Sequence, residues 1–380
     1  MKILQITSSF YPILGGQEKV VFETSKCLVE MGHEITILTT DLFCEGKKLP
    51  LEESIEGIRI IRMKNKLSLK GYGYSPDAVK WLKKNWKKYD IVHSHGYNRF
   101  LSEYALRYLR NKVPTVFSAH GFIHTKKNYL FKILHDITLG KFVRYADKCT
   151  ALTKLDYNEY SKLGVQKENV IDLPNGVDVE KYDHPDKKYV ASLKKKFKLI
   201  GKTLLYTGRI HKSKGLNHVI EAIEDLDCKF LLVGQDAGYK DELIRVSKKL
   251  GIEDRVVFAG CLPDDEFIAS YYASDIFILF SEWEGFGIVA IEAMAAGKPL
   301  IVSDRGSLPF VVKDGKTGFV VPFENKKLLK EKIKLLLSNP KIRKTIGDDG
   351  KNESKKYSWK QIVHNLEKVY KTILNKAERF

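Results

Sequence analysis

Short apolar segments alternate with longer helical segments twice along the chain, and this alternation constrains the fold more than any other feature. In the first series we expect strands at residues 3–7, 34–39, 58–62, 90–93, 115–119 and 148–152. In the second series we expect them at residues 203–207, 230–234, 256–259, 276–280, 300–303 and 319–321. Continuously apolar strands fit parallel sheets that are covered on both faces. The sequence therefore predicts an α/β fold with two doubly wound parallel-sheet domains.

The length supports two domains, since 380 residues exceed one ordinary core and fit two cores of roughly 150–200 residues. Proline, Asn-Gly and several charged residues interrupt the pattern around residues 174–185. We therefore expect an N-terminal domain at 1–178, a connection at 179–200 and a C-terminal domain at 201–356. Apolar residues at helical spacing predict a terminal helix at 358–374, within a last segment of 357–380.

The composition limits the class of protein. With 43% hydrophobic and 29% charged residues, the chain is expected to fold. We expect no membrane span, because no run of about 18 apolar residues occurs. Polar residues also interrupt the first strand before a signal-peptide core could form. The five cysteines are far apart and include no Cys-x-x-Cys pair, which predicts neither disulfides nor a zinc site and favours a cytoplasmic location.

The formal net charge of +18 indicates an anionic partner, which could be nucleic acid, anionic lipid or a phosphorylated small molecule. The positive residues are mostly lysines spread over many segments, whereas nucleic-acid recognition favours clustered arginines. We therefore expect no nucleic acid as a partner. A proteome rich in lysine would produce the same excess of charge.

A pair of glycines follows the first strand. Gly15 and Gly16 precede a helix whose N-terminal amides could meet a phosphate, and glycine lets the backbone approach a ligand closely. The dinucleotide fingerprint Gly-x-Gly-x-x-Gly is absent there, which argues against a nicotinamide-dependent enzyme. A plain tight turn is the alternative interpretation.

A histidine closes another strand in the same half. His120, followed by Gly121, ends the strand at 115–119, where a neutral imidazole could hydrogen-bond a hydroxyl or polarise a reacting group. A purely structural histidine is the alternative. His93 and His95 form a neighbouring pair at the end of the preceding expected strand and just after it, but no third ligand accompanies them at a typical spacing, so we expect no metal.

The C-terminal half places two cations beside one helix start. Arg209 follows Gly208 at the end of a strand, and Lys214 precedes Gly215 where the next helix begins. An arginine fork, a lysine point charge and a helix dipole together suit a diphosphate. Solvated basic residues in a loop are the alternative.

The most informative segment runs from Glu284 to Glu292, where two acids bracket a glycine-rich turn that becomes a helix. A fully helical segment would separate the acids by about 12 Å. Glycosidase acid pairs lie about 5–9.5 Å apart, so a two-carboxylate hydrolase is disfavoured. We expect the acids to hold two ends of one elongated ligand; a dipole-stabilising acid and a surface acid are the alternative. The amides that could meet phosphate oxygens are those of Phe286, Gly287, Ile288 and Val289.

Taken together, these elements and the segment Pro174-Asn175-Gly176-Val177-Asp178 resemble glycosyltransferase family 4 over nearly the whole chain. The Glu-x7-Glu element, continued by Glu-Ala-Met-Ala-Ala-Gly at residues 292–297, is the most specific part. The resemblance implies a GT-B fold, with two Rossmann-like domains facing a deep cleft and a last helix that returns to the N-terminal domain. It also implies retaining transfer of a sugar from a UDP- or GDP-sugar donor, without a metal or a cofactor.

The resemblance implies a role for each matching residue. Arg209 and Lys214 would hold the diphosphate, and Glu292 the ribose. Glu284 would contact the donor sugar and His120 the transferred sugar, which makes these two the catalytic candidates. The donor-binding candidates are Gly15, Gly16, Asn175, Arg209, Lys214, Phe286, Gly287, Ile288, Val289 and Glu292. The segment 305–310 lacks the second glycine and the acid that relatives often carry. A GT-B epimerase or phosphorylase is the alternative enzyme, and a non-enzymatic nucleic-acid binder is a distant third.

Residues 66–88 hold seven lysines and one acid, on a helix expected to begin at Pro76. Lysines around aromatic residues suit an anionic bilayer surface, where a lipid-linked acceptor would be met. Alternatively, the apolar face covers the sheet and the lysines stay solvated. We expect a glycan or lipid-linked acceptor, as in cell-surface polysaccharide synthesis, with peripheral attachment to the inner face of the cell membrane as a candidate. The membrane-surface candidates are Lys80, Trp81, Lys83, Lys84, Trp86 and Lys87, with residues 126–141 as a second segment.

Overall fold

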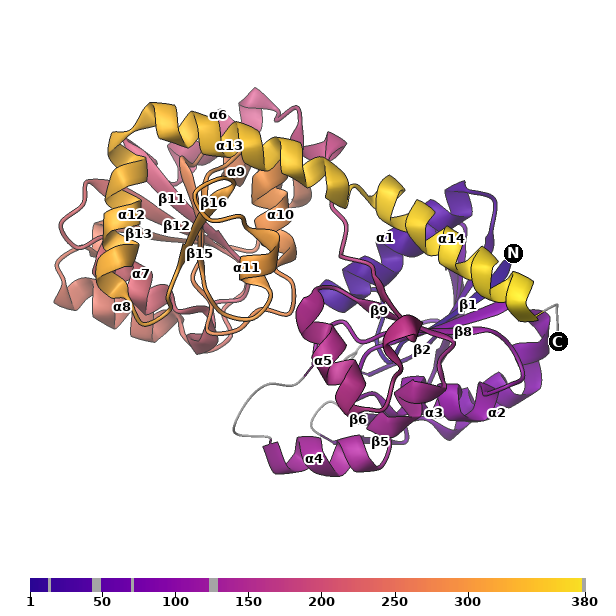
Figure 1. Cartoon of the computed structure of the whole chain (residues 1–380). Coiled ribbons are helices and arrows are strands. Elements are labelled where there is room, and N and C mark those ends of the chain that lie inside the picture. Colours follow the sequence, from indigo (N-terminus) through magenta and orange to yellow (C-terminus); the bar gives the residue numbers. More distant parts are fainter. Residues whose placement is uncertain (13–14, 43–48, 70–71, 123–128, 378–380) are drawn as a thin grey trace. The chain divides into compact units, whose positions relative to one another are not determined.

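The computed structural model describes the chain except for residues 13–14, 43–48, 70–71, 123–128 and 378–380. The chain folds into two compact units, each built on its own sheet (Figure 1). Unit 1 contains Met1–Asn175 and Trp359–Phe380, and unit 2 contains Gly176–Ser358. The C-terminal segment therefore belongs to the same unit as the N-terminus.

Within the described residues, unit 1 has an eight-stranded sheet in the order β10-β9-β8-β7-β1-β2-β4-β3. All pairings are parallel except that of β3 with β4. Central β1 pairs with β2 on one side, where Leu4 lies opposite Thr36, and with β7 on the other, where Leu4 lies opposite Val92. The strands are β1 (Lys2–Ile6), β2 (Glu34–Thr40), β3 (Glu52–Ile55), β4 (Ile58–Met63), β7 (Ile91–His95), β8 (Thr115–Ser118), β9 (Lys148–Ala151) and β10 (Val170–Asp172), with a separate hairpin of β5 (Leu67–Leu69) and β6 (Tyr72–Tyr74).

Helices cover both faces of this sheet (Figure 1). Ile3 of β1 belongs to one core cluster with Leu366 of α14, whereas Leu4 belongs to another with Leu82 of α2. Successive strand residues point to opposite faces, which explains why β1 is apolar at consecutive positions. The first face is covered by α1 (Gly16–Glu30) and α14 (Trp359–Ala377), and the second by α2 (Pro76–Asn85) and α3 (Phe100–Leu109). The unit also contains α4 (Tyr129–Ile137), η3 (Gly140–Tyr145) and α5 (Lys154–Lys162).

Unit 2 has a six-stranded parallel sheet, among the described residues, in the order β13-β12-β11-β14-β15-β16. Its strands are β11 (Lys202–Thr207), β12 (Cys228–Val233), β13 (Val256–Gly260), β14 (Ile276–Leu279), β15 (Leu300–Ser303) and β16 (Gly318–Val321). Its helices are α6 (Lys187–Lys196), α7 (Leu216–Ala222), α8 (Lys240–Lys249), α9 (Asp264–Tyr272), α10 (Ile288–Ala295), α11 (Leu308–Val311), α12 (Lys326–Ser338) and α13 (Pro340–Ser354). The predicted α/β fold with two parallel-sheet domains is confirmed.

The expected strands are present to within about two residues at their ends, but three features differ from the predictions. The polar strand β3 pairs antiparallel at the sheet edge, where its alternately exposed residues tolerate water. The short strand β10 extends the other edge. The segment 179–200, predicted as a connection, carries η5 (Glu180–Tyr182) and α6, and Lys196 of α6 pairs with Glu266 of α9 at 3.1 Å. In the part of the chain that the structure describes, every helix is too short or too polar to cross a membrane.

Candidate functional site

Each sheet reverses its strand order at a point where polar residues follow a strand. The reversal falls between β1 and β7 in unit 1, and between β11 and β14 in unit 2. In open α/β sheets, ligands bind outside the carboxyl ends of the strands at such a reversal. His95 ends β7 in unit 1, whereas Arg209 and Glu284 follow β11 and β14 in unit 2. Each unit therefore has one candidate binding edge.

Two histidines are joined at the edge of unit 1. His95 Nδ1 lies 2.8 Å from His120 Nε2, and His95 Nε2 hydrogen-bonds the amide oxygen of Gln5. Because an amide oxygen only accepts, His95 carries its proton on Nε2 and accepts at Nδ1. His120 therefore donates from Nε2, which leaves its Nδ1 as a lone-pair acceptor.

A third histidine connects this edge to the C-terminal helix. The Tyr370 hydroxyl of α14 lies 2.6 Å from His93 Nδ1, and His93 Nε2 lies 2.8 Å from Ser118 Oγ. Burial lowers the pKa of His93 and His95 well below the usual range, and lowers the pKa of His120 to about 4. At neutral pH the three rings are therefore uncharged, so they act as hydrogen-bond partners rather than as cations.

His120 lines a small cavity, and one of its ring nitrogens has no hydrogen-bond partner among the described residues. The cavity measures about 20 Å³ and is also lined by Ser118, Thr150 and Asn175. This volume suits about one water molecule or one hydroxyl group. His120 Nδ1 is buried and has no hydrogen-bond partner among the described residues. The backbone of His120 has a φ of 56° and Gly121 a φ of 116°, so a sharp turn places this ring at the end of β8.

The glycine pair lies at the start of α1, as predicted, but the helix already has its own carboxylate. Ser9 donates to Glu18 in the first turn, and a Cβ on Gly15 would lie 2.4 Å from Glu18 Oε2. A carboxylate in this position satisfies the positive end of the helix dipole. Gly15 and Gly16 are therefore better suited to a neutral ligand group than to a second anion.

In unit 2, an ion pair joins two residues that the sequence assigns to different ends of a ligand. Lys214 Nζ lies 2.6 Å from Glu284 Oε1, and both side chains are less than one-fifth exposed. Ser281 Oγ donates to the same carboxylate oxygen at 2.8 Å. A Cβ on Gly215 would lie 2.2 Å from the carbonyl oxygen of Phe280, so glycine lets the Lys214 loop approach the end of β14. The carboxylate is thus fixed by one cation and one hydroxyl.

Arg209 occupies the end of the neighbouring strand. Its carbonyl accepts a hydrogen bond from the Tyr206 hydroxyl at 2.9 Å, which fixes the backbone after β11. Its side chain is exposed, and the carboxylate at the end of the adjacent strand, Glu284, pairs with Lys214 instead. A guanidinium that is held at its base and solvated at its tip is available to an anionic ligand.

The turn between the two acids is not helical, so a helical rise does not give their separation. α10 begins at Ile288, after Gly287 with a φ of 86°, and Phe286 is buried against Tyr357. Glu292 is only 2% exposed and accepts a hydrogen bond from the Tyr271 hydroxyl at 3.1 Å. Burial and this carboxylate raise the pKa of Tyr271 well above its usual range. Glu292 is therefore a buried, hydrogen-bonded acid, whereas Glu284 is partly open.

Several partners of these residues were not predicted from the sequence, among them Gln5, Tyr370, Ser281 and Tyr271. Gln5 alone carried a signal, because it is a polar residue at a fully buried position of an apolar strand. Tyr370 follows a regular apolar helix pattern, and its role depends on where α14 packs. Among the described residues, no group of three histidine, cysteine or acidic side chains could hold a metal ion.

Comparison with known proteins places the chain in a family. "Glycosyltransferase Family 4" matches residues 14–181, and "Glycosyl transferases group 1" matches residues 192–353. An uncharacterised glycosyltransferase of Methanocaldococcus jannaschii is 30% identical over 388 residues, covering 98% of this chain and 99% of the relative. The N-acetyl-alpha-D-glucosaminyl L-malate synthase of Bacillus anthracis is 26% identical, covering 98% of this chain and 97% of the relative. The chain belongs to the glycosyltransferase family that these two models describe, and is an enzyme.

Solved structures give the fold. Sucrose-phosphate synthase from Thermosynechococcus elongatus matches with a TM-score of 0.80 and 22% identity, over 99% of both chains. Anabaena HepE, solved in complex with UDP and glucose, matches with a TM-score of 0.77 and 20% identity, over 98% of this chain and 100% of that chain. The two units are accordingly the two Rossmann-like domains of a GT-B fold, as the resemblance implied.

Proposed function

We propose that the protein transfers a sugar, with retention of configuration, from a UDP- or GDP-sugar to a glycan or lipid-linked acceptor, without a metal ion. The observation that carries the proposal is the Lys214–Glu284 pair, 2.6 Å apart at the strand-order reversal of unit 2. It sets a phosphate-binding cation beside a carboxylate that can accept from sugar hydroxyls. The UDP complex of Anabaena HepE, a protein of the same fold, supports a nucleotide donor.

Arg209 and Lys214 stabilise the leaving diphosphate, together with the amides at the start of α10. Two cations and helix-end amides supply the charge stabilisation that a divalent ion would otherwise give. Glu284 accepts hydrogen bonds from the donor sugar, and Glu292 holds the ribose. Because Glu292 is buried and hydrogen-bonded to Tyr271 and Tyr182, this last role requires the ribose to reach a carboxylate that already has partners.

In the reaction, the bond between the anomeric carbon and the diphosphate oxygen breaks, and the diphosphate leaves with the electron pair. The acceptor hydroxyl oxygen bonds to the anomeric carbon on the same face, and its proton passes to the leaving phosphate oxygen. His120 accepts a hydrogen bond at Nδ1 from a hydroxyl of the transferred sugar. Gln5 and His95 position His120 by fixing its donor and acceptor nitrogens.

The acceptor cannot be carried over from the relatives, because their names include both an inositol 3-phosphate and a malate acceptor. We keep the proposal of a glycan or lipid-linked acceptor, with a cytoplasmic enzyme attached peripherally to an anionic membrane. Trp81 of α2 and Trp86, directly after this helix, pack partly buried against the sheet core, whereas Lys83 and Lys84 of α2 are exposed. The lysines of α2, rather than the two tryptophans, are therefore the candidates for a membrane surface.

A donor screen tests the proposed function. Thermal unfolding is measured with UDP, GDP, ADP and their sugars, with and without EDTA, since a ligand of the folded state raises its stability. We expect one nucleotide family to raise the melting temperature regardless of EDTA, and free nucleotide to be released only when an acceptor is present. Nucleotide-sugar interconversion without an acceptor would instead show an epimerase.

A further inference from the structure

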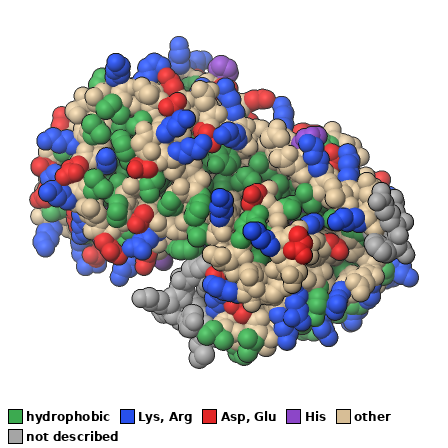
Figure 2. Space-filling view, in the orientation of Figure 1, with side chains coloured by type: hydrophobic (Ala, Val, Ile, Leu, Met, Phe, Trp, Pro, Cys, Tyr) green, Lys and Arg blue, Asp and Glu red, His purple; other side chains and the backbone are tan. Residues whose placement is uncertain are grey.

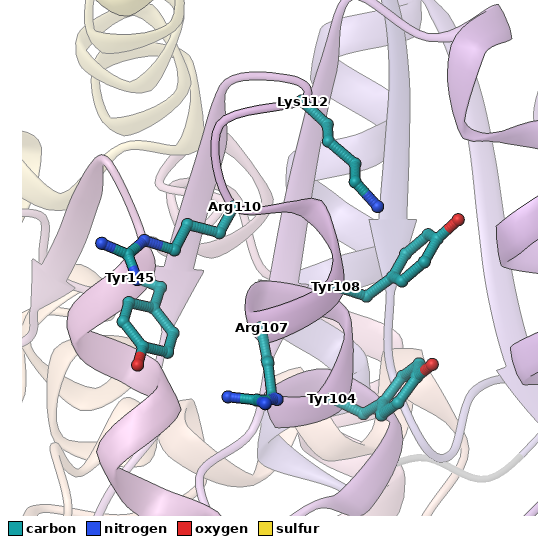
Figure 3. Close-up of a pocket in the computed structure, with 6 residues that line it drawn as sticks. All are labelled: Tyr104, Arg107, Tyr108, Arg110, Lys112 and Tyr145. Carbon is teal, nitrogen blue, oxygen red and sulfur yellow. The ribbon is translucent and has the colours of Figure 1, made fainter.

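A basic pocket of about 390 Å³ lies on unit 1, outside the residues assigned to sugar transfer (Figure 3). It is formed by α3 from Tyr104 onward, the turn after this helix and the end of η3. We call the following residues the basic pocket: Tyr104, Arg107, Tyr108, Arg110, Lys112 and Tyr145.

The tyrosine rings of the basic pocket are in contact with lysine and arginine side chains, so their faces are not open to a ligand. Lys112 Nζ lies 3.6 Å from the centre of the Tyr108 ring, and Lys83 Nζ lies 5.6 Å from it. The Arg110 and Arg144 guanidinium carbons lie 4.5 Å and 5.2 Å from the centre of the Tyr145 ring. Stacking of a sugar or a base needs an open ring face, and these rings are already in contact with cations. The aromatic residues therefore fix the positions of positive charges.

No acid compensates these charges within the described part of the chain. Arg107, Arg110 and Lys112 are exposed and have no ion pair there. The acid of α3, Glu103, is fully buried and bonds to His135 of α4 at 2.9 Å. On the face that Figure 2 shows, basic and acidic side chains are interspersed over much of the surface. An uncompensated group of arginine forks suits phosphate groups.

An exposed apolar strip lies on α4, which the Glu103–His135 pair ties to α3. Ile133, Leu134 and Ile137 are 40%, 58% and 61% exposed. They lie on one side of the helix at i, i+1 and i+4 spacing. The chain passes from this helix into η3, which supplies Tyr145 to the basic pocket. Residues 126–128 of the predicted second membrane segment lie outside the described residues.

We propose that the basic pocket and the apolar strip of α4 together bind the surface of an anionic bilayer. The arginine forks contact lipid phosphates, while Leu134 and Ile137 enter the boundary between headgroups and acyl chains. The proposal deepens the membrane part of the proposed function, and its measurement does not depend on sugar transfer. It locates attachment on α3, η3 and α4, beyond the lysines of α2.

Vesicle sedimentation of the full chain tests the proposal. Vesicles of phosphatidylcholine with about one-third phosphatidylglycerol are compared with pure phosphatidylcholine. We expect Arg107→Gln, Arg110→Gln and Lys112→Gln combined to lower binding to anionic vesicles roughly 100-fold, at about five-fold per charge. The matched control removes three exposed lysines of unit 2 (Lys327→Gln, Lys334→Gln and Lys341→Gln) and should retain binding. An equal loss of vesicle binding in the control would show that the net positive charge of the protein, and not the basic pocket, attracts the membrane, and would refute the proposal.

A second variant separates insertion from charge. Leu134→Gln with Ile137→Gln changes exposed side chains, so folding should be preserved, and we expect weaker vesicle binding at every salt concentration. Equal binding of the wild type to both vesicle types, or none to either, contradicts the proposal. Displacement from anionic vesicles by millimolar inorganic phosphate would assign the basic pocket to a soluble phosphate ligand instead. If the donor screen fails but these vesicle results hold, the sugar-transfer part of the proposed function is wrong and the membrane site stands.

Discussion

His95 Nδ1 lies 2.8 Å from His120 Nε2, and the two rings are stacked with their centres 5.1 Å apart. The proton on this bond belongs to His120, because the Gln5 amide oxygen holds the proton of His95 at Nε2. The pair therefore sets which nitrogen of His120 is left without a proton. The sequence does not predict the tautomer of His120, because neither the protonated nitrogen nor the partner ring follows from its position in the chain.

Replacing His95 tests this positioning role. His95→Leu removes the acceptor for His120 Nε2, and we expect turnover to fall roughly 2–10-fold, as for the loss of a hydrogen bond of about 0.5–1.5 kcal/mol. The KM for the donor should change little. His95→Asn, which keeps a carbonyl oxygen near the former Nδ1, should recover part of the activity. Long-range nitrogen–proton NMR should show the His120 proton on Nε2; a proton on Nδ1 would contradict the assignment.

Stability should depend on pH through His120. Burial lowers the pKa of this ring from 6.5 to about 4, so between these values the unfolded chain binds a proton that the folded chain does not. The free energy of unfolding should therefore fall as the pH falls from 6.5 toward 4, by up to about 3 kcal/mol. His120→Asn, which tolerates the φ of 56°, should make the curve measured by urea unfolding less steep, while the buried His93 and His95 keep part of the slope. If the curves of the wild type and His120→Asn run parallel, His120 does not cause the pH dependence of stability.

Arg209 should matter for catalysis and not for folding. Arg209→Ala removes a charge-assisted contact worth about 1.5–3 kcal/mol, which corresponds to a loss of roughly 10–150-fold in kcat/KM. The melting temperature should stay unchanged, since the side chain is exposed. Arg209→Lys keeps the charge without the fork and should fall between the two. Unchanged kinetics in Arg209→Ala would remove this residue from the site.

Glu284 should act on the sugar rather than on the nucleotide. Glu284→Gln keeps an oxygen that can accept from Ser281 but loses the ion pair with Lys214. We expect nucleotide binding in a calorimetric titration to be preserved and transfer to be depressed. Lys214→Gln, as the matched change of the other partner, should weaken nucleotide binding itself. Full transfer activity in Glu284→Gln would show that Glu284 has no role in binding the donor sugar.

The backbone at Gly306 packs closely against the backbone of Glu284, and a substitution of this glycine tests that contact. Gly306 has a φ of 63°, and its Cβ would lie 2.2 Å from the carbonyl oxygen of Glu284. Gly306→Ala should therefore cost more than about 2 kcal/mol of stability and also reduce transfer, because Glu284 must move. Gly251 has a similar φ of 66° with nothing within 4 Å of its added Cβ, so Gly251→Ala should cost only about 1 kcal/mol. Equal losses in the two variants would refute the steric argument.

The sequence by itself determined the two series of strands, because buried parallel strands must be apolar on both faces and Ile3 and Leu4 can be read without coordinates. It also identified the polar residues that follow β11 and β14, since ligand-binding residues gather at strand ends. It could not give β3, whose polar residues resemble a loop until a partner strand pairs with them.

Only the tertiary structure decided which of these residues meet. Lys214 and Glu284 are 70 positions apart, and their pairing depends on the close packing of two loops over adjacent strands. The bond from Tyr370 to His93 depends on α14 packing beside α1, far along the chain from β7. Hydrogen bonds and ion pairs have ranges of a few ångströms, so their partners are fixed by packing and not by spacing along the chain.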